Sequence, residues 1–150
     1  MSVLILRFGT LIFSGVLAGA MFAIMIAFNK QPLSFPSYLE QHQNLIKAFN
    51  VLMPLLGLVT IVLTTVSAFI HRGSKAIFVS LTVAVILLIG SGLITRFGNQ
   101  PINAIVMTWS GEMAPGDWTV LREKWAMLHV LRTILSVLAF CVIGWTSFRK

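Results

Sequence analysis

Four side chains that could bind a ligand or take part in catalysis lie in one apolar stretch near the C-terminus: Trp125, His129, Arg132 and Ser136. Their spacing places all four on one face of an α-helix. Histidine can accept a proton near neutral pH, and arginine can hold a developing negative charge. This row therefore marks His129 and Arg132 as candidate catalytic residues. The alternatives are a hydrogen-bonded interfacial histidine for His129 and, for Arg132, an anchor that snorkels to the headgroups.

Two asparagines, Asn99 and Asn103, precede this row and lie one helical turn apart. On a helix they point the same way, and they serve either to face a ligand or to cap a helix. Further candidates, for contact with substrate, fall at the same end of the predicted helices: Trp109, Trp118, Trp125, His42 and Asn50. Tryptophans at one membrane interface also form the aromatic belt typical of membrane proteins, so both interpretations stay open.

Metal-ligand motifs are sparse. His71 is predicted at the opposite end from His42, because the 29 residues between them span about 43 Å of helix. His42 and His129 remain, fewer than the three protein ligands of a catalytic zinc site but enough for the two axial positions of a haem. The single cysteine allows no disulfide within the chain and no cysteine cluster. We expect no metal and no cofactor, with haem on His42 and His129 as the alternative.

Composition decides which elements must position these side chains. The chain has 150 residues, of which 57% are hydrophobic and 10% charged, whereas soluble domains have roughly 45–50% and 25%. So little charge cannot cover a soluble surface, and a membrane protein follows. The formal net charge is +7, but the basic residues flank apolar runs, where they anchor helices to headgroups. We therefore expect membrane lipid as a partner and no nucleic acid.

Four runs have the length, about 20 residues, that crosses a hydrocarbon core. They lie at about residues 4–28, 46–70, 76–95 and 125–148. The first contains a sequence similar to a signal-peptide cleavage site, Ala18-Gly19-Ala20, but its apolar run continues to Phe28 and is predicted to be a retained span. We predict an all-α integral membrane four-helix bundle, one transmembrane domain over residues 1–150, with a structured outer connection between spans 3 and 4.

Charge also predicts orientation. The four acidic residues all lie in the first and third connections, whereas the second connection, residues 71–75, is short and basic. By the positive-inside rule, the second connection and both termini face the cytoplasm of the plasma (inner) membrane.

Local signals predict three further features. A capping box at Ser37–Glu40 starts a helix that we expect to run unbroken into the second span. Residues 101–109 predict a short interfacial helix, and Asp117 is placed to cap the fourth span. Gly15 and Gly19 form a GxxxG pair, which serves close packing inside the bundle or self-association to a homo-oligomer.

Taken together, the third connection and the fourth span resemble the anthrone oxygenase-like family of small four-span membrane proteins. The Gly15–Phe22 stretch and the Met53-Pro54 step are also similar, so the resemblance covers nearly the whole chain. Its sharpest part is the pattern Asn99-x-Pro101-Ile102-Asn103, then Trp109, then Trp118-x3-Arg122-x2-Trp125-x3-His129-x2-Arg132. The resemblance implies oxidation of anthrones to anthraquinones by dioxygen, without flavin or haem.

The leading functional hypothesis is therefore a cofactor-independent, oxygenase-like oxidoreductase. In the chemistry that the resemblance implies, His129 is the base, and Arg132, Asn99 and Asn103 stabilise the developing oxyanion. Its partners would be dioxygen and a hydrophobic phenolic or polycyclic molecule that stacks on the tryptophans. Two rival hypotheses remain: a haem- or metal-binding redox protein that uses His42 and His129, and a non-enzymatic membrane protein that binds lipid or a partner helix through Gly15 and Gly19.

Overall fold

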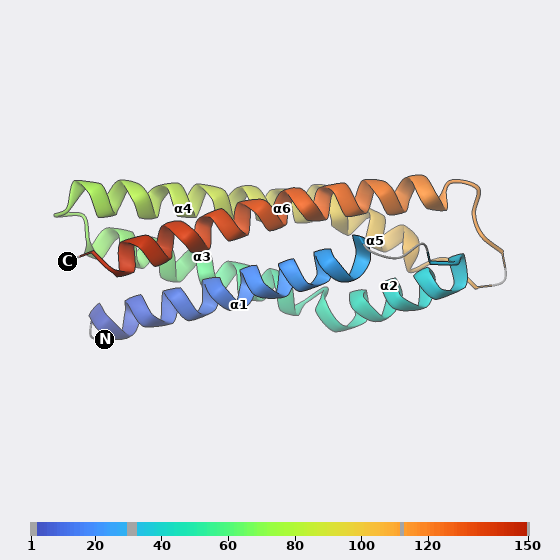
Figure 1. Ribbon diagram of the computed structural model, residues 1–150, viewed down its shortest axis with the longest axis horizontal. Helices are drawn as coiled ribbons and strands as arrows, with labels where there is room; N and C mark the ends of the chain where they lie inside the picture. The colour runs from blue at the N-terminus through green and yellow to red at the C-terminus, as the bar shows by residue number, and fades with distance from the viewer. Residues whose placement is uncertain (1–2, 30–32, 112, 150) are drawn as a thin grey trace.

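A computed structural model describes residues 3–29, 33–111 and 113–149. Four long helices lie side by side along the molecule, with both chain ends at one end and α2 and α5 at the other (Figure 1). The helices are α1 (Val3–Asn29), α2 (Phe35–Phe49), α3 (Leu52–Ile70), α4 (Lys75–Ile94), the π-helical segment η1 (Thr95–Asn99), α5 (Gln100–Val106) and α6 (Trp118–Ser147). The predicted all-α four-span bundle is confirmed.

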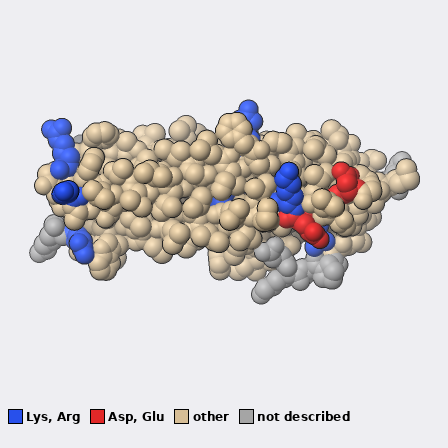
Figure 2. Space-filling view, turned by 90° about the horizontal axis from the view of Figure 1, so that it is seen from above, with Lys and Arg blue, Asp and Glu red and all other residues tan. Residues whose placement is uncertain are grey.

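The surface of the bundle suits lipid rather than water. Four helices are long and apolar enough to cross a membrane, and they expose large apolar side chains such as Leu58, Ile86 and Leu93. In Figure 2 the acidic side chains gather at one end, whereas the end that carries the termini shows only basic ones. The chain is therefore an integral membrane protein. The direction in which it inserts stays a prediction.

Small residues bring the helices close together. Ala84 on α4 and Ala139 on α6 have no exposed surface. A Cβ atom at Gly15 would lie 3.2 Å from Cε2 of Phe140, so α1 packs tightly on α6 there, whereas Gly19 is exposed with open space around it. Gly15 thus serves packing inside the bundle, and self-association through this stripe stays a prediction.

The expected unbroken helix into the second span is wrong. Helix α2 begins at Phe35, with Ser34 at its N-cap, and ends at Phe49, and α3 begins at Leu52. Pro54 explains the break, because proline has no N–H and its ring clashes with the carbonyl four residues earlier, which is that of Asn50. Consequently α2 is a separate amphipathic helix beyond the second span.

The third connection is structured, as predicted, but its first half continues the third span. Helix α4 runs through η1 into α5, so the third apolar segment extends from Lys75 to Val106. The short helix predicted within residues 101–109 is α5, which does not lie apart on the interface. Gly98 allows this arrangement, because a Cβ atom there would lie 2.9 Å from Cδ1 of Leu128 on α6. Asp117 occupies the N-cap of α6 but makes no side-chain cap hydrogen bond.

Candidate functional site

Two histidines and a tryptophan meet where α1, α2, α5 and α6 come together, at the end of the bundle away from the termini. The Trp125 ring is stacked on His129, with centroids 5.0 Å apart and an interplanar angle of 2°. The same indole lies 4.6 Å from the His42 ring at 62°. All three side chains are almost fully buried. The structure thus brings His42 and His129 together around Trp125.

The first histidine belongs to a closed hydrogen-bond network. The Trp125 indole N–H can only donate, and it donates to Asn103 Oδ1 at 2.8 Å. Asn103 Oδ1 therefore also accepts from His42 Nε2 at 3.3 Å, which places a proton on Nε2. His42 Nδ1 then accepts from the Tyr38 hydroxyl at 2.7 Å. His42 is thus neutral and has both ring nitrogens occupied.

The second histidine is fixed in the same tautomer by different partners. His129 Nε2 donates to the carbonyl oxygen of Met21 at 3.0 Å, because a carbonyl can only accept. Arg132 donates to His129 Nδ1 from Nε at 3.0 Å and from Nη2 at 2.7 Å. A guanidinium cannot accept, so Nδ1 carries no proton and His129 is neutral. The His129 imidazole therefore holds the side chain of Arg132 close to the surface of α6, the helix that carries both residues.

Arg132 itself is buried, with 8% of its surface exposed, so the inward-facing interpretation holds and the snorkelling one does not. Nη1 donates to Thr95 Oγ1 at 3.0 Å, which leaves two N–H groups of the guanidinium available. Ser91 and Ser136 donate to the Arg132 carbonyl and fix the backbone. Among the described acidic residues, none forms an ion pair with Arg132. A buried, unbalanced positive charge is expensive in a membrane span, which makes Arg132 a candidate functional residue.

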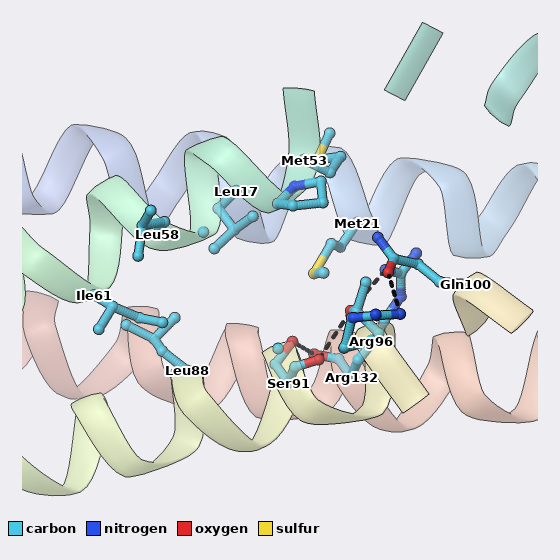
Figure 3. A pocket seen from close by; sticks show the side chains of 14 residues that line it. Leu17, Met21, Met53, Leu58, Ile61, Leu88, Ser91, Arg96, Gln100 and Arg132 are labelled. Carbon is cyan, nitrogen blue, oxygen red and sulfur yellow. Dashed lines mark hydrogen bonds between the residues drawn. The ribbon is translucent and has the colours of Figure 1, made fainter. Parts of the chain in front are cut away.

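A cavity of about 250 Å³ lies next to this arginine. Arg132, Ser91, Arg96 and Gln100 gather at one end of it, and Leu58, Ile61 and Leu88 lie at the other (Figure 3). The rest of the lining comes from α1, α3, α4 and η1: Leu17, Met21, Met53, Pro54, Gly57, Gly92 and Thr95. Among the residues that the structure describes, no Asp or Glu lines this cavity. It is an apolar chamber with a cationic end and is slightly smaller than the usual ~300 Å³ lower bound for ligand pockets.

Arg132 also lines a second, smaller cavity of about 40 Å³. Its polar lining includes Asn50, Asn103, Gln100 and the Trp125 indole, and the rest of its lining is mostly apolar. This volume exceeds the ~10–15 Å³ that one water molecule needs, and the lining supplies several hydrogen-bonding groups. Arg132 therefore lines both the larger apolar chamber and a small cavity that can hold water.

The structure brings together most of the residues that the sequence singled out. Asn99 donates from Nδ2 to the carbonyl of Trp125 at 3.1 Å, and its Oδ1 is buried without a partner. Asn50 and Asn103 line the smaller cavity. Trp109 and Trp118 lie apart from both cavities, because their rings pack on Phe35 at 6.0 and 5.4 Å.

Several lining residues were not predicted. Thr95 and Ser91 hold Arg132, and Gln100 lines both cavities. Ser91 and Thr95 are four residues apart within an otherwise apolar span, a signal that could have been used. Tyr38 and His42 have the same spacing on α2. Helix η1 explains the placement of Thr95, because π-helical turns re-aim side chains and occur often at functional sites.

Two groups outside the spans have shifted pKa values. Burial lowers the pKa of His42 from about 6.5 to about 4, and the hydrogen bond with Asn103 opposes only part of this shift. Burial raises the pKa of the Tyr38 phenol to about 12, against the opposing charge of Arg122. Both residues therefore stay neutral over the whole physiological range.

These contacts do not fit a haem or a metal held by the two histidines. Axial ligation needs a free ring nitrogen on each histidine, but all four nitrogens of His42 and His129 are hydrogen-bonded within the protein. Within residues 3–29, 33–111 and 113–149, no three His, Cys, Asp or Glu side chains are grouped to hold a metal ion.

Fold and site together define a four-span membrane protein with a buried arginine at the end of an apolar cavity. The profile of the family described as anthrone oxygenase matches residues 43–142, well over half of the chain. The protein therefore belongs to the anthrone oxygenase family. The matched segment includes α3, α4, η1 and α5, and the part of α6 that carries His129 and Arg132. Comparison with curated proteins and with solved structures gives no match.

Proposed function

We propose that the protein is a membrane-embedded oxygenase that oxidises a hydrophobic, phenolic polycyclic substrate of the anthrone type with dioxygen. One observation carries the proposal: Arg132 is buried, has no carboxylate partner among the described residues, and ends an apolar cavity of about 250 Å³. A flat aromatic molecule that becomes an anion during reaction matches both the apolar walls and the charge. Membership of the anthrone oxygenase family supports the same chemistry.

The reaction needs little beyond charge stabilisation. An anthrone carries an acidic CH₂ group opposite its carbonyl. Loss of one proton gives an enolate, which donates electrons to dioxygen and forms a C–O bond as a hydroperoxide. Loss of water then converts that carbon to the second quinone carbonyl, so CH₂ plus O₂ becomes C=O plus H₂O. The substrate supplies all the electrons that reduce dioxygen.

Arg132 is the group that would stabilise the enolate oxygen. Its Nε and Nη2 both donate to the single lone pair of His129 Nδ1, so one of these two hydrogen bonds can be given up when substrate binds while the other keeps the side chain in place. Together with the two available N–H groups, this gives a preorganised donor set in a largely apolar cavity. Removal of one oxyanion donor typically costs about 10²–10³-fold in rate. The smaller cavity offers a place where water can take the proton and where product water can leave.

His129 has two candidate roles, as the base and as a positioning residue. As the base it must first release Nδ1 from Arg132, although contacts of this kind often rearrange when substrate binds. As a positioning residue it acts through Arg132. Asn99 and Asn103 support the same helices, and Trp125 stacks on His129. In the proposal, the outer wall of the site around Arg132 is formed by the remaining candidates: Trp109, Trp118, His42 and Asn50.

Oxidation of anthrone by the purified protein in nanodiscs tests the proposal. Quinone absorbance and oxygen consumption would be measured together. We expect Arg132→Lys, which keeps charge but loses the fork of donors, to lower kcat at least about tenfold, and Arg132→Gln to lower it further. The matched control is Arg72→Lys in the loop between α3 and α4. Turnover at the parental rate in both Arg132 variants would refute the proposal.

A single variant separates the two roles of His129. Glutamine can accept from Arg132 and donate to Met21 as histidine does, but it cannot titrate. If His129 is the base, His129→Gln lowers kcat at least about tenfold and removes one limb of the pH–rate profile. If His129 positions Arg132, His129→Gln keeps most of the activity, whereas His129→Leu lowers kcat by as much as Arg132→Lys does.

A further inference from the structure

The larger cavity has an inside and a rim. Its inner wall consists of buried residues, including Met21, Ser91 and Arg132. Four other lining residues are exposed on the surface of the bundle: Pro54, Leu58, Gly92 and Arg96. The first two belong to α3 and the last two to α4 and η1. The mouth of the cavity therefore lies between α3 and the continuous helix that α4 and η1 form.

The mouth lies at the depth of the hydrocarbon chains. Gly92 is 17 residues beyond the start of α4 at Lys75, about 25 Å along the helix axis. Leu58 is 12 residues before the end of α3 at Ile70, about 18 Å from the same end. Both positions fall within a core of about 30 Å. Arg96, four residues further on, reaches the opposite boundary. The mouth thus opens to lipid, with one guanidinium at headgroup level.

Two glycines of the cavity lining, Gly57 on α3 and Gly92 on α4, lie at the mouth and are called the rim glycines. A Cβ atom at either of them would meet nothing within 4 Å. Where α6 packs on its neighbours, by contrast, a Cβ at Gly90 would meet Leu135 at 3.4 Å, and one at Gly15 or Gly98 would be closer still to its neighbour. A larger side chain at either rim glycine would therefore narrow the mouth of the cavity.

We propose that this mouth is a lateral portal through which the substrate enters from the bilayer. The expected occupant is a planar aromatic molecule with an ionisable oxygen, dissolved among the acyl chains. Arg96 at the rim would attract the oxygen, and Arg132 inside would hold it. The occupant's identity rests on the proposed function. The route rests on the exposed rim, its depth and the open glycines.

Ligand exchange without turnover tests the portal. The probe is 9-anthracenecarboxylate, a fluorescent planar anion, added by stopped flow to the protein in phosphatidylcholine vesicles. We expect Gly57→Leu and Gly92→Leu to slow association and dissociation together by at least about tenfold, so that Kd changes much less than either rate. Gly19→Leu is the matched control, because Gly19 is also exposed in a span with open space around it. It should leave both rates unchanged.

Three outcomes would overturn the portal, and a fourth would overturn only the proposed reaction. Parental rates in both rim variants would mean that the probe enters elsewhere. A weaker Kd with a parental association rate would place the two glycines inside the binding site rather than at its entrance. Probe binding that survives Arg132→Gln unchanged would mean that the probe does not occupy this cavity. If the rates depend on the rim glycines but anthrone is not oxidised, the portal stands and the proposed reaction fails.

Discussion

Protonation of His42 should destabilise the outer end of the bundle in acid. The imidazole is fully buried, and in its neutral form it donates to Asn103 and accepts from Tyr38. A second proton would remove the acceptor at Nδ1 and would place a charge beside Trp125 and Phe28. The perturbation is therefore a fall in pH, with His42→Gln as the variant that does not titrate.

The size of the effect follows from the shifted pKa. The pKa of His42 is about 4 in the folded protein and about 6.5 in the unfolded chain. Between these values the unfolded chain binds a proton that the folded protein does not, so the free energy of unfolding falls as the pH is lowered. The full contribution, about 3 kcal/mol at about 1.4 kcal/mol per pH unit, is present above pH 6.5 and lost by pH 4.

Thermal melting in detergent from pH 7.5 to pH 4.5 measures this loss. Glutamine keeps both hydrogen bonds, since its amide can donate to Asn103 and accept from Tyr38. We expect the parent to lose about 5–10 °C more than His42→Gln over this range, at about 2–4 °C per kcal/mol. The other titrating groups are common to both proteins and cancel. Parallel losses in parent and variant would refute the deduced neutral tautomer.

Three further predictions concern orientation, packing and charge. In a Cys141→Ser background, Ser74→Cys should react with an impermeant thiol reagent only after the cytoplasmic side is opened, and Ala114→Cys should react in intact cells; the reverse pattern would invert the topology. Gly98→Ala should lower the melting temperature by several degrees, because its Cβ would lie 2.9 Å from Leu128, and an unchanged melting curve would contradict this close contact. Saturating 9-anthracenecarboxylate should stabilise the parent by about 2–3 kcal/mol at a hundredfold excess over Kd, and neutral anthracene by less; equal stabilisation by the two would show that charge does not matter.

Much of the fold could be predicted from the sequence, because lipid imposes few solutions on an apolar chain. Four runs of sufficient length and no soluble surface leave a helical bundle. The break at Asn50–Val51 was missed, although Pro54 signals it. Proline is tolerated within many membrane helices, so the sequence alone does not say where one breaks.

The candidate site was predicted in part. The row on α6 was recognisable because polar side chains at helical spacing are rare in an apolar span, and burial confirms that His129 and Arg132 face inward. The cavity was not predictable, because most of its walls are ordinary apolar side chains of α1, α3 and α4. Only packing decides that a gap remains between α3 and α4, and periodicity carries no information about such a gap.

The charge of Arg132 explains why the arrangement suits a reaction that creates an anion. The Arg132 guanidinium does not extend to the headgroups. It forms hydrogen bonds with His129 and Thr95 instead. Those neutral partners disperse the charge without cancelling it. In the proposed reaction the substrate enters neutral and becomes an enolate beside the guanidinium, so the charge is balanced only once deprotonation has begun. In a medium of low dielectric constant that gain is large, and it applies to the transition state more than to the bound substrate, which is the condition for catalysis.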